Sequence, residues 1–209
     1  MNSRVTAPLV VLLFAALALA PAQKITGGLK AGMNLATVSG FEDELGEDVG
    51  YRMGFCGGGF AAFALGDIVV IQPEFLFSQK GLKAEETVLD ETWTLTYKFS
   101  YLEIPLSFKM VLPIQGKVKP NFFVGPYFAM MITTPRGKIE VDGVSMEADL
   151  NDVAEIDFGV VFGGGVDFGL GKGKIVLDFR YGLGLTTLDE TGTEDVKNGA
   201  FSFLIGYSF

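Results

Sequence analysis

The chain ends with Asn198-Gly-Ala-Phe-Ser-Phe-Leu-Ile-Gly-Tyr-Ser-Phe209, a stretch that alternates in character to its last position. Successive side chains of a β-strand point to opposite faces, so one face carries the large apolar residues Phe201, Phe203, Ile205, Tyr207 and Phe209. A soluble protein rarely exposes an apolar strip of this size to water, whereas a strand that faces lipid requires one. The stretch therefore predicts a membrane strand that ends on Phe209.

Apolar residues are abundant in the rest of the chain, but they are interleaved with polar ones. They make up 49% of the 209 residues, and the mean hydropathy is +0.37. After Gln23 no apolar run approaches the roughly 17–25 residues that a transmembrane helix needs. Only helices and closed β-barrels can satisfy every backbone polar group within lipid. We therefore expect a closed barrel.

The two-residue period of a strand recurs along the chain. It is found in eight segments: 25–39, 50–65, 68–80, 101–112, 122–132, 156–168, 175–185 and 198–209. Their connections alternate between short (66–67, 113–119, 169–173) and long (40–49, 81–92, 135–154, 186–197). Short turns at one rim and long loops at the other are typical of outer-membrane barrels. The pattern predicts an all-β fold, an eight-stranded antiparallel up-and-down transmembrane β-barrel whose last strand pairs with 25–39.

Two places depart from this regular pattern. The apolar positions are odd from Trp93 to Phe99 but even from Leu102 to Met110. Either a β-bulge near Ser100 shifts the phase, or the earlier half of the strand stands above the membrane. The segment 138–147 reads as a hairpin, but its arms are shorter than the roughly 9–11 residues of a transmembrane strand. We interpret it as a projection of the third long loop.

Prolines and glycines fall inside several of the proposed strands. Pro73, Pro105 and Pro126 each remove a ladder donor, which predicts bulges or positions near a rim. The glycine runs 57–59 and 163–165 lie within strands and have no following Lys-Ser/Thr, so they do not form a phosphate-binding loop. We expect them to allow bending and close approach of strands.

The start of the chain is typical of a secretory signal peptide. Arg4 supplies the positive charge, and an almost wholly apolar run follows from Leu9 to Ala20. Small residues favour cleavage after Ala22, with an uncleaved anchor as the alternative. This divides the chain into a signal peptide, 1–22, and a barrel domain, 23–209.

Composition excludes several classes of function. The formal net charge is −9, and it becomes −10 without Arg4, so a nucleic-acid partner is not expected. The chain has no histidine, which excludes mechanisms that need an imidazole base or ligand. Cys56 is the only cysteine, so no internal disulfide can form. We expect no catalytic residues, no cofactor and no bound metal.

Charged residues occupy the lumen-facing positions of the predicted strands: Arg52, Glu74, Lys80, Glu103, Lys109, Asp178 and Arg180. An eight-stranded barrel has an interior that side chains fill, so charges there must pair or stay hydrated. We interpret these residues as a structural charge network that plugs the lumen. A proton or ion path is the alternative.

The four long loops are acidic. They hold 18 of the 25 acidic residues. Clustered carboxylates are the ligands of divalent cations, but no loop has the spacing of an EF-hand. We interpret the loops as a solvated surface.

Several motifs together resemble one family of bacterial proteins. Gln72-Pro-Glu-Phe-Leu-Phe-Ser-Gln-Lys-Gly81, Tyr101-Leu-Glu-Ile-Pro-Leu106 and Asp178-Phe-Arg-Tyr-Gly-Leu-Gly184 are similar to the PorT-like "porin family" outer-membrane β-barrel domain, as are 28–36, 125–127 and 206–209. The resemblance implies the outer membrane, with lipid around the barrel. It also implies insertion by the barrel-assembly machinery, which reads a last strand ending in Phe. Tyr207 and Phe209 would then form the assembly signal.

The resemblance carries over no catalytic residue, and some members of the family resemble secretion accessory proteins. We therefore expect a non-enzymatic integral outer-membrane barrel with a structural or interaction role, including a secretion-accessory one. A narrow, porin-like solute channel is the alternative. A membrane hydrolase of the known barrel type would need histidine. A lipocalin-like carrier would have no use for a lipid-facing aromatic strip on every strand.

Overall fold

The computed structural model describes residues 24–40, 49–88, 91–141, 144–150, 153–189 and 195–209. The predicted signal peptide and its cleavage site lie outside these residues. No helix among the described residues is long and apolar enough to cross a membrane.

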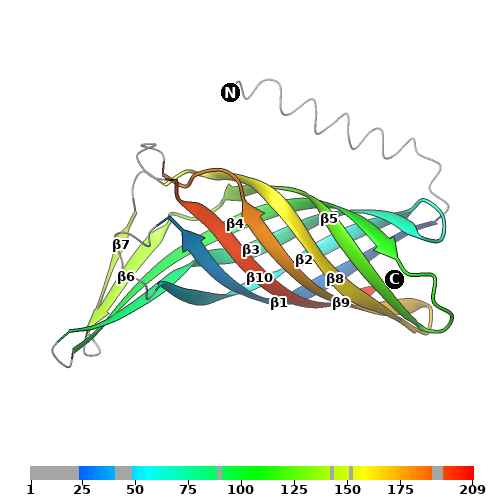
Figure 1. The fold of residues 1–209 in the computed structure, drawn as a ribbon, viewed down its shortest axis with the longest axis horizontal. Helices are drawn as coiled ribbons and strands as arrows, with labels where there is room; N and C mark the ends of the chain where they lie inside the picture. Colours follow the sequence, from blue (N-terminus) through cyan, green and yellow to red (C-terminus); the bar gives the residue numbers. More distant parts are fainter. Residues whose placement is uncertain (1–23, 41–48, 89–90, 142–143, 151–152, 190–194) are drawn as a thin grey trace, which may run out of the picture.

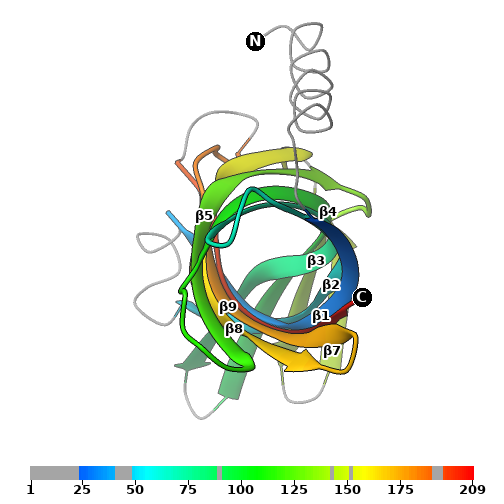
Figure 2. The ribbon, with the colours of Figure 1, turned by 90° about the vertical axis from the view of Figure 1, so that its right-hand side faces the viewer.

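Antiparallel strands close into a ring, seen end on in Figure 2. Eight strands form it, in the order β1 (Lys24–Ser39), β2 (Val49–Ala64), β3 (Val69–Val88), β4 (Glu91–Val111), β5 (Val118–Met131), β8 (Ile156–Leu170), β9 (Gly173–Gly184) and β10 (Lys197–Ser208). The last strand returns to the first, with Met33 opposite Phe203. The predicted antiparallel up-and-down barrel is confirmed, including the pairing of its two terminal strands.

The remaining two strands do not belong to the ring. β6 (Arg136–Val141) and β7 (Val144–Asp149) form a hairpin, and β6 pairs with the stretch of β4 from Trp93 to Lys98. Figure 1 shows the hairpin beyond the end of the barrel, opposite the end that carries the C-terminus. The hairpin therefore projects from a long loop, as its short arms predict. We call the four-stranded extension made by the outer halves of β3 and β4 with β6 and β7 the projecting sheet.

The phase change in β4 is not a bulge. The register between β3 and β4 runs from Val69–Met110 to Val88–Glu91 without a shift. Odd residues of β4, from Phe99 to Lys109, are buried inside the barrel, whereas Phe108 and Met110 are exposed outside it. Apolar side chains thus change from the outer to the inner face along one continuous strand, because its upper half stands above the membrane.

The neighbouring strand changes at the same height. On the outer face of β3 the apolar run ends at Phe77, and Gln79 and Lys83 follow it. Phe77 lies opposite Leu102 and Gln79 lies opposite Ser100, where β4 makes its own change. The level at which both strands change marks the boundary of the apolar band at the long-loop end of the barrel.

The prolines interrupt the ladder without shifting it. Pro105 falls opposite Glu74, and the pairing of β3 with β4 is broken there but resumes at Leu76 in the same register. The bulges and rim positions predicted for the prolines are therefore wrong at Pro105. The glycine runs do serve close approach. A Cβ at Gly58 would lie 2.0 Å from the carbonyl oxygen of Phe75, so strand β2 could not lie where it does with a side chain there.

The outer boundary can be tested with arginine substitutions on either side of it. Phe108→Arg places a charge in the apolar band and should lower the free energy of unfolding in vesicles by about 2–4 kcal/mol. Thr94→Arg, on the outer face of the same strand above the boundary and opposite Glu85 and Glu140, should lower it by less than about 0.5 kcal/mol. Similar losses for the two variants would place the upper half of β4 within the membrane.

Candidate functional site

The barrel interior is layered along its axis, and the inner face of β3 shows the order. From the short-turn end it reads Val70, then Gln72 and Glu74, then Leu76, then Ser78 and Lys80, and finally Leu82 and Ala84. Other strands supply matching layers. Phe60, Ala62 and Val176 pack near Val70, and Cys56 and Leu204 pack with Leu76. Polar and apolar layers therefore alternate through the lumen.

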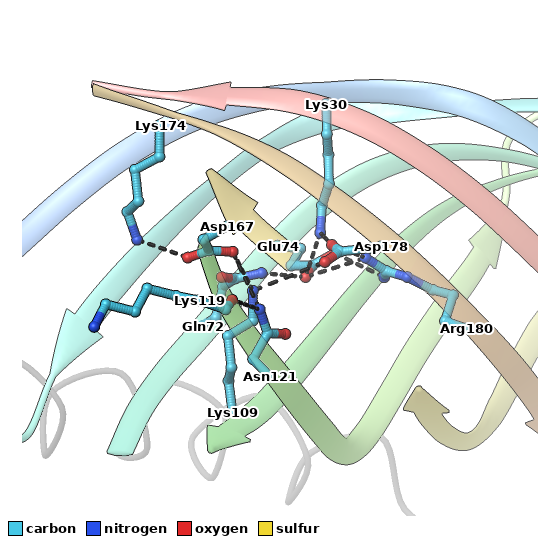
Figure 3. Close-up of polar contacts among 10 residues, drawn as sticks. All are labelled: Lys30, Gln72, Glu74, Lys109, Lys119, Asn121, Asp167, Lys174, Asp178 and Arg180. Atoms are coloured by element: carbon cyan, nitrogen blue, oxygen red, sulfur yellow. Dashed lines mark hydrogen bonds and ion pairs between the residues drawn. The ribbon is translucent and has the colours of Figure 1, made fainter. Parts of the chain in front are cut away.

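The polar layer around Glu74 is a lower charge cluster, drawn in Figure 3. Its members are Lys30, Glu74, Lys109, Asp167, Asp178 and Arg180. None of these side chains is more than 6% exposed. They come from β1, β3, β4, β8 and β9, so the cluster connects walls of the barrel that share no backbone ladder.

Four members of the lower charge cluster form a ring of alternating charge. The Lys30 Nζ lies 2.7 Å from Glu74 Oε1 and 2.9 Å from Asp178 Oδ2. Arg180 closes the ring, with Nη1 2.8 Å from Glu74 Oε2 and Nη2 3.2 Å from Asp178 Oδ2. Each carboxylate thus lies between two cations. This geometry repays part of the desolvation cost that a buried charge carries.

The charge ring is extended by further polar residues toward the short-turn end of the barrel. Lys109 Nζ lies 3.8 Å from both Asp167 Oδ1 and Asp178 Oδ1, longer than a hydrogen bond. Lys174 Nζ bonds Asp167 Oδ2 at 2.8 Å, and its side chain is 41% exposed, so the network reaches solvent here. Asn121 donates to Asp167 Oδ1 at 3.2 Å.

A second, upper charge cluster surrounds Lys80. Its Nζ lies 2.8 Å from Glu103 Oε2 and 3.7 Å from Asp157 Oδ2. The same ammonium sits 4.4 Å from the ring centre of Tyr127, a cation–π distance. Tyr127 and Asn198 both donate to Asp157 Oδ2, at 3.1 and 3.0 Å. Lys80 is thus held by two carboxylates and by the rings of Tyr101 and Tyr127.

An apolar cap lies above the upper charge cluster. Leu82, Ala84 and Phe99 pack there with Val38 from β1 and with Leu188 and Val196 from the segment between β9 and β10. The cap shields the cluster from the outer end of the lumen.

The structure places the sequence-predicted charged residues in different parts of the lumen. Glu74, Lys109, Asp178 and Arg180 lie in the lower charge cluster, and Lys80 and Glu103 lie in the upper one. Arg52 joins neither by an ion pair among the described residues. It is half-buried, and its Nη1 donates to the carbonyl oxygen of Lys80 at 2.9 Å.

Sequence reasoning missed three charged partners. Lys30, Asp157 and Asp167 lie on the inward side of their strands and complete both clusters. Their inward parity was the available signal. The predicted assembly signal lies elsewhere, since Tyr207 and Phe209 point outward and are exposed. The backbone of Phe209 donates to Gly27 at 2.9 Å, which ties the chain end to β1.

The described residues include no group of three or more Asp, Glu, Cys or His side chains that could hold a metal ion. Most of the first acidic loop (41–48) lies outside these residues, as do shorter parts of the other three (89–90, 142–143, 151–152 and 190–194). Cys56 is a free cysteine buried within the Leu76 layer.

Residues 21–190 match the family described as "Outer membrane protein beta-barrel domain", so the chain belongs to this family. A comparison with curated protein sequences gave no significant match. Family membership and the closed barrel together establish a bacterial outer-membrane protein.

Several solved barrels are similar in structure. Ail of Yersinia pestis has 19% identity and a TM-score of 0.44, covering 90% of this chain and 100% of that one. Neisserial surface protein A has 15% identity and a TM-score of 0.45, covering 88% and 98%. OprG of Pseudomonas aeruginosa has 12% identity and a TM-score of 0.45, covering 88% and 92%.

Removing one buried carboxylate should destabilise the barrel strongly. Glu74→Gln leaves Lys30 and Arg180 to share Asp178 and should lower the free energy of unfolding by about 3–5 kcal/mol. Glu85→Gln breaks the exposed ion pair with Lys83 and should cost less than about 1 kcal/mol. Unfolding by denaturant in vesicles gives both values. Equal, small losses would mean that the lower charge cluster contributes little to stability.

Proposed function

We propose that the protein is a non-enzymatic, plugged outer-membrane barrel whose lumen charges are structural and whose role is interaction above the membrane. The observation that carries the proposal is the interlocked ring of Lys30, Glu74, Asp178 and Arg180, with side chains no more than 3% exposed. Groups held this way are poor candidates for carrying ions, because moving one would leave its partners buried and unpaired.

The apolar layers support the same conclusion. A solute channel needs a continuous hydrated path, yet Leu76, Cys56 and Leu204 form a buried apolar cluster at the level between the two charge clusters. The apolar cap lies above them and the Phe60 layer below. The narrow-channel alternative would require these layers to part.

The lack of histidine argues against the hydrolytic chemistry of known barrel enzymes. The sequence also resembles PorT-like proteins, some of which resemble secretion accessories. An accessory role is consistent with a barrel whose projecting sheet lies outside the apolar band. Lipid and, during insertion, the barrel-assembly machinery are its proposed partners.

Conductance separates a plugged barrel from a channel. Purified protein in planar bilayers should give current near background, because the layers leave no hydrated path. Arg180→Ala should lower the stability of the barrel and leave the current near background, since the apolar layers remain. Large, reproducible current steps from the wild type would overturn the plug and favour the channel.

Insertion is proposed to depend on the end of β10. Phe209→Ala should reduce the amount of folded barrel in cells more than it lowers the stability of the finished barrel, because the side chain is exposed outside the ring. Phe203→Ala, another exposed aromatic of the same strand, is the matched control and should give a smaller assembly defect. Heat-modifiability gels of cell fractions measure assembly, and denaturant unfolding measures stability. Parallel defects in both assays for Phe209→Ala would contradict the assembly signal.

A further inference from the structure

The projecting sheet has one apolar and one polar face. Residues directly opposite each other on antiparallel strands share a face. The rows Trp93–Val141–Val144, Leu95–Ile139–Met146 and Tyr97–Gly137–Ala148 therefore form the apolar face across β4, β6 and β7. The opposite face carries Thr94, Thr96 and Lys98 of β4, Arg136, Lys138 and Glu140 of β6, and Ser145, Glu147 and Asp149 of β7.

The apolar face is most exposed on β7, the strand farthest from the barrel. Leu82 on β3 is 0% exposed because it packs in the apolar cap. Trp93 on β4 is 46% exposed and Ile139 on β6 is 48% exposed. Val144 and Met146 on β7 reach 72% and 76%. The core of the barrel thus continues into the projecting sheet and ends uncovered at β7.

The outer edge of β7 is also open. β7 is last in the strand order, and all of its residues are exposed. Exposed edges are usually blunted by lysine, proline or a bulge. The strand Val144–Asp149 contains no lysine or proline, and its register with β6 runs without a shift. No described strand pairs with its backbone donors and acceptors on that side, so they are available to another strand.

The polar face gives β7 a charge preference. Asp149 has Arg136 at 3.7 Å, and both side chains are more than half exposed. Lys138 bonds Glu140 at 2.6 Å, and this hydrogen bond raises the pKa of Lys138. Lys138 is therefore held by Glu140, although it lies opposite Glu147 in the register. On the side of β7 that faces away from β6, no cation of the projecting sheet lies next to Glu147 or Asp149.

We propose that β7 binds an extended segment of a partner protein in which apolar residues alternate with lysine or arginine. The segment adds a fifth strand to the projecting sheet. Its apolar residues extend the face of Val144 and Met146, and its cations lie beside Glu147 and Asp149. Main-chain hydrogen bonds supply affinity in such strand addition, and the alternate side chains supply specificity. The inference rests on the proposed interaction role and names the class of partner.

A second copy of the chain does not fit this edge. Copies in the same membrane are related by an axis along the membrane normal. That rotation would join the apolar face of one projecting sheet to the polar face of the other. Lipid does not fit either, because the projecting sheet lies above the boundary marked by Phe77 and Leu102.

Binding can be measured with a fluorescent peptide of alternating valine and lysine and the full-length protein in nanodiscs. Fluorescence anisotropy should show saturable binding, and hydrogen exchange should show protection of the β7 amides. A peptide of the same composition with valines and lysines in separate blocks is the control and should bind weakly. Equal binding of the two peptides would overturn strand addition.

Variants of β7 test which of its residues contribute to binding of the peptide. Glu147→Lys with Asp149→Lys should weaken binding of the alternating peptide about tenfold, because two attractive cross-strand pairs become repulsive. Glu155→Lys with Asp195→Lys makes the same charge change at exposed positions off the projecting sheet and should leave binding unchanged. Val144→Thr with Met146→Thr should also weaken binding while keeping β-forming residues. Equal affinity of the wild type and the Glu147/Asp149 variant would overturn the proposal.

The result of the β7 binding test can be separated from the result of the conductance test of the proposed function. A barrel that stays non-conducting but fails to bind the alternating peptide overturns only the docking edge. Conductance with intact peptide binding overturns only the plug. Crosslinking of wild-type copies that is lost in the Glu147/Asp149 variant would show self-association through β7 and would overturn the choice of a foreign strand.

Discussion

Lipid offers the backbone no hydrogen-bond partner, and this constraint shapes every level of the molecule. It requires β10 to return to β1, because an open edge within the membrane would leave a row of unpaired groups. Closure gives each strand an inner and an outer face. The outer face must be apolar, and the inner face of so narrow a ring is filled by side chains. The buried ion pairs around Glu74 and Lys80 are one solution to filling that space.

The constraint ends where the strands leave the membrane, and the sequence changes with it. Below Phe77 and Leu102 the outward-facing side chains of β3 and β4 are apolar, and above them polar residues take the outer face of both strands. The backbone continues without a bulge through this level. The side-chain pattern therefore changes because lipid gives way to water outside the barrel, and not because the strand changes its geometry. Only above the boundary can an edge such as that of β7 remain open, since water can satisfy it there.

Alternation predicted which side of its strand each charge occupies, and it did so for Asp178 and Arg180. It could not predict which charges meet. Glu74 on β3 pairs with Arg180 on β9 across the lumen because the stagger of the strands brings them to one height, and side-chain alternation carries no information about stagger. The same limit applied to Trp93–Phe99, where a bulge and a projecting strand predict the same pattern. The matching change in β3 distinguishes them, and only the register shows that match.

The lower charge cluster joins residues that are far apart in the chain. Lys30 is separated by 44 residues from Glu74 and by 148 from Asp178, while Glu74 and Arg180 are 106 apart. No single hairpin holds a complete ring of charges, so a partly assembled wall would present unpaired ions that water must solvate. The ion pair of Glu74 with Arg180 can form only when β3 and β9, on opposite walls of the barrel, face each other. The network therefore makes completion of the barrel cooperative, because its ion pairs stabilise the closed barrel relative to every intermediate that lacks some of the strands.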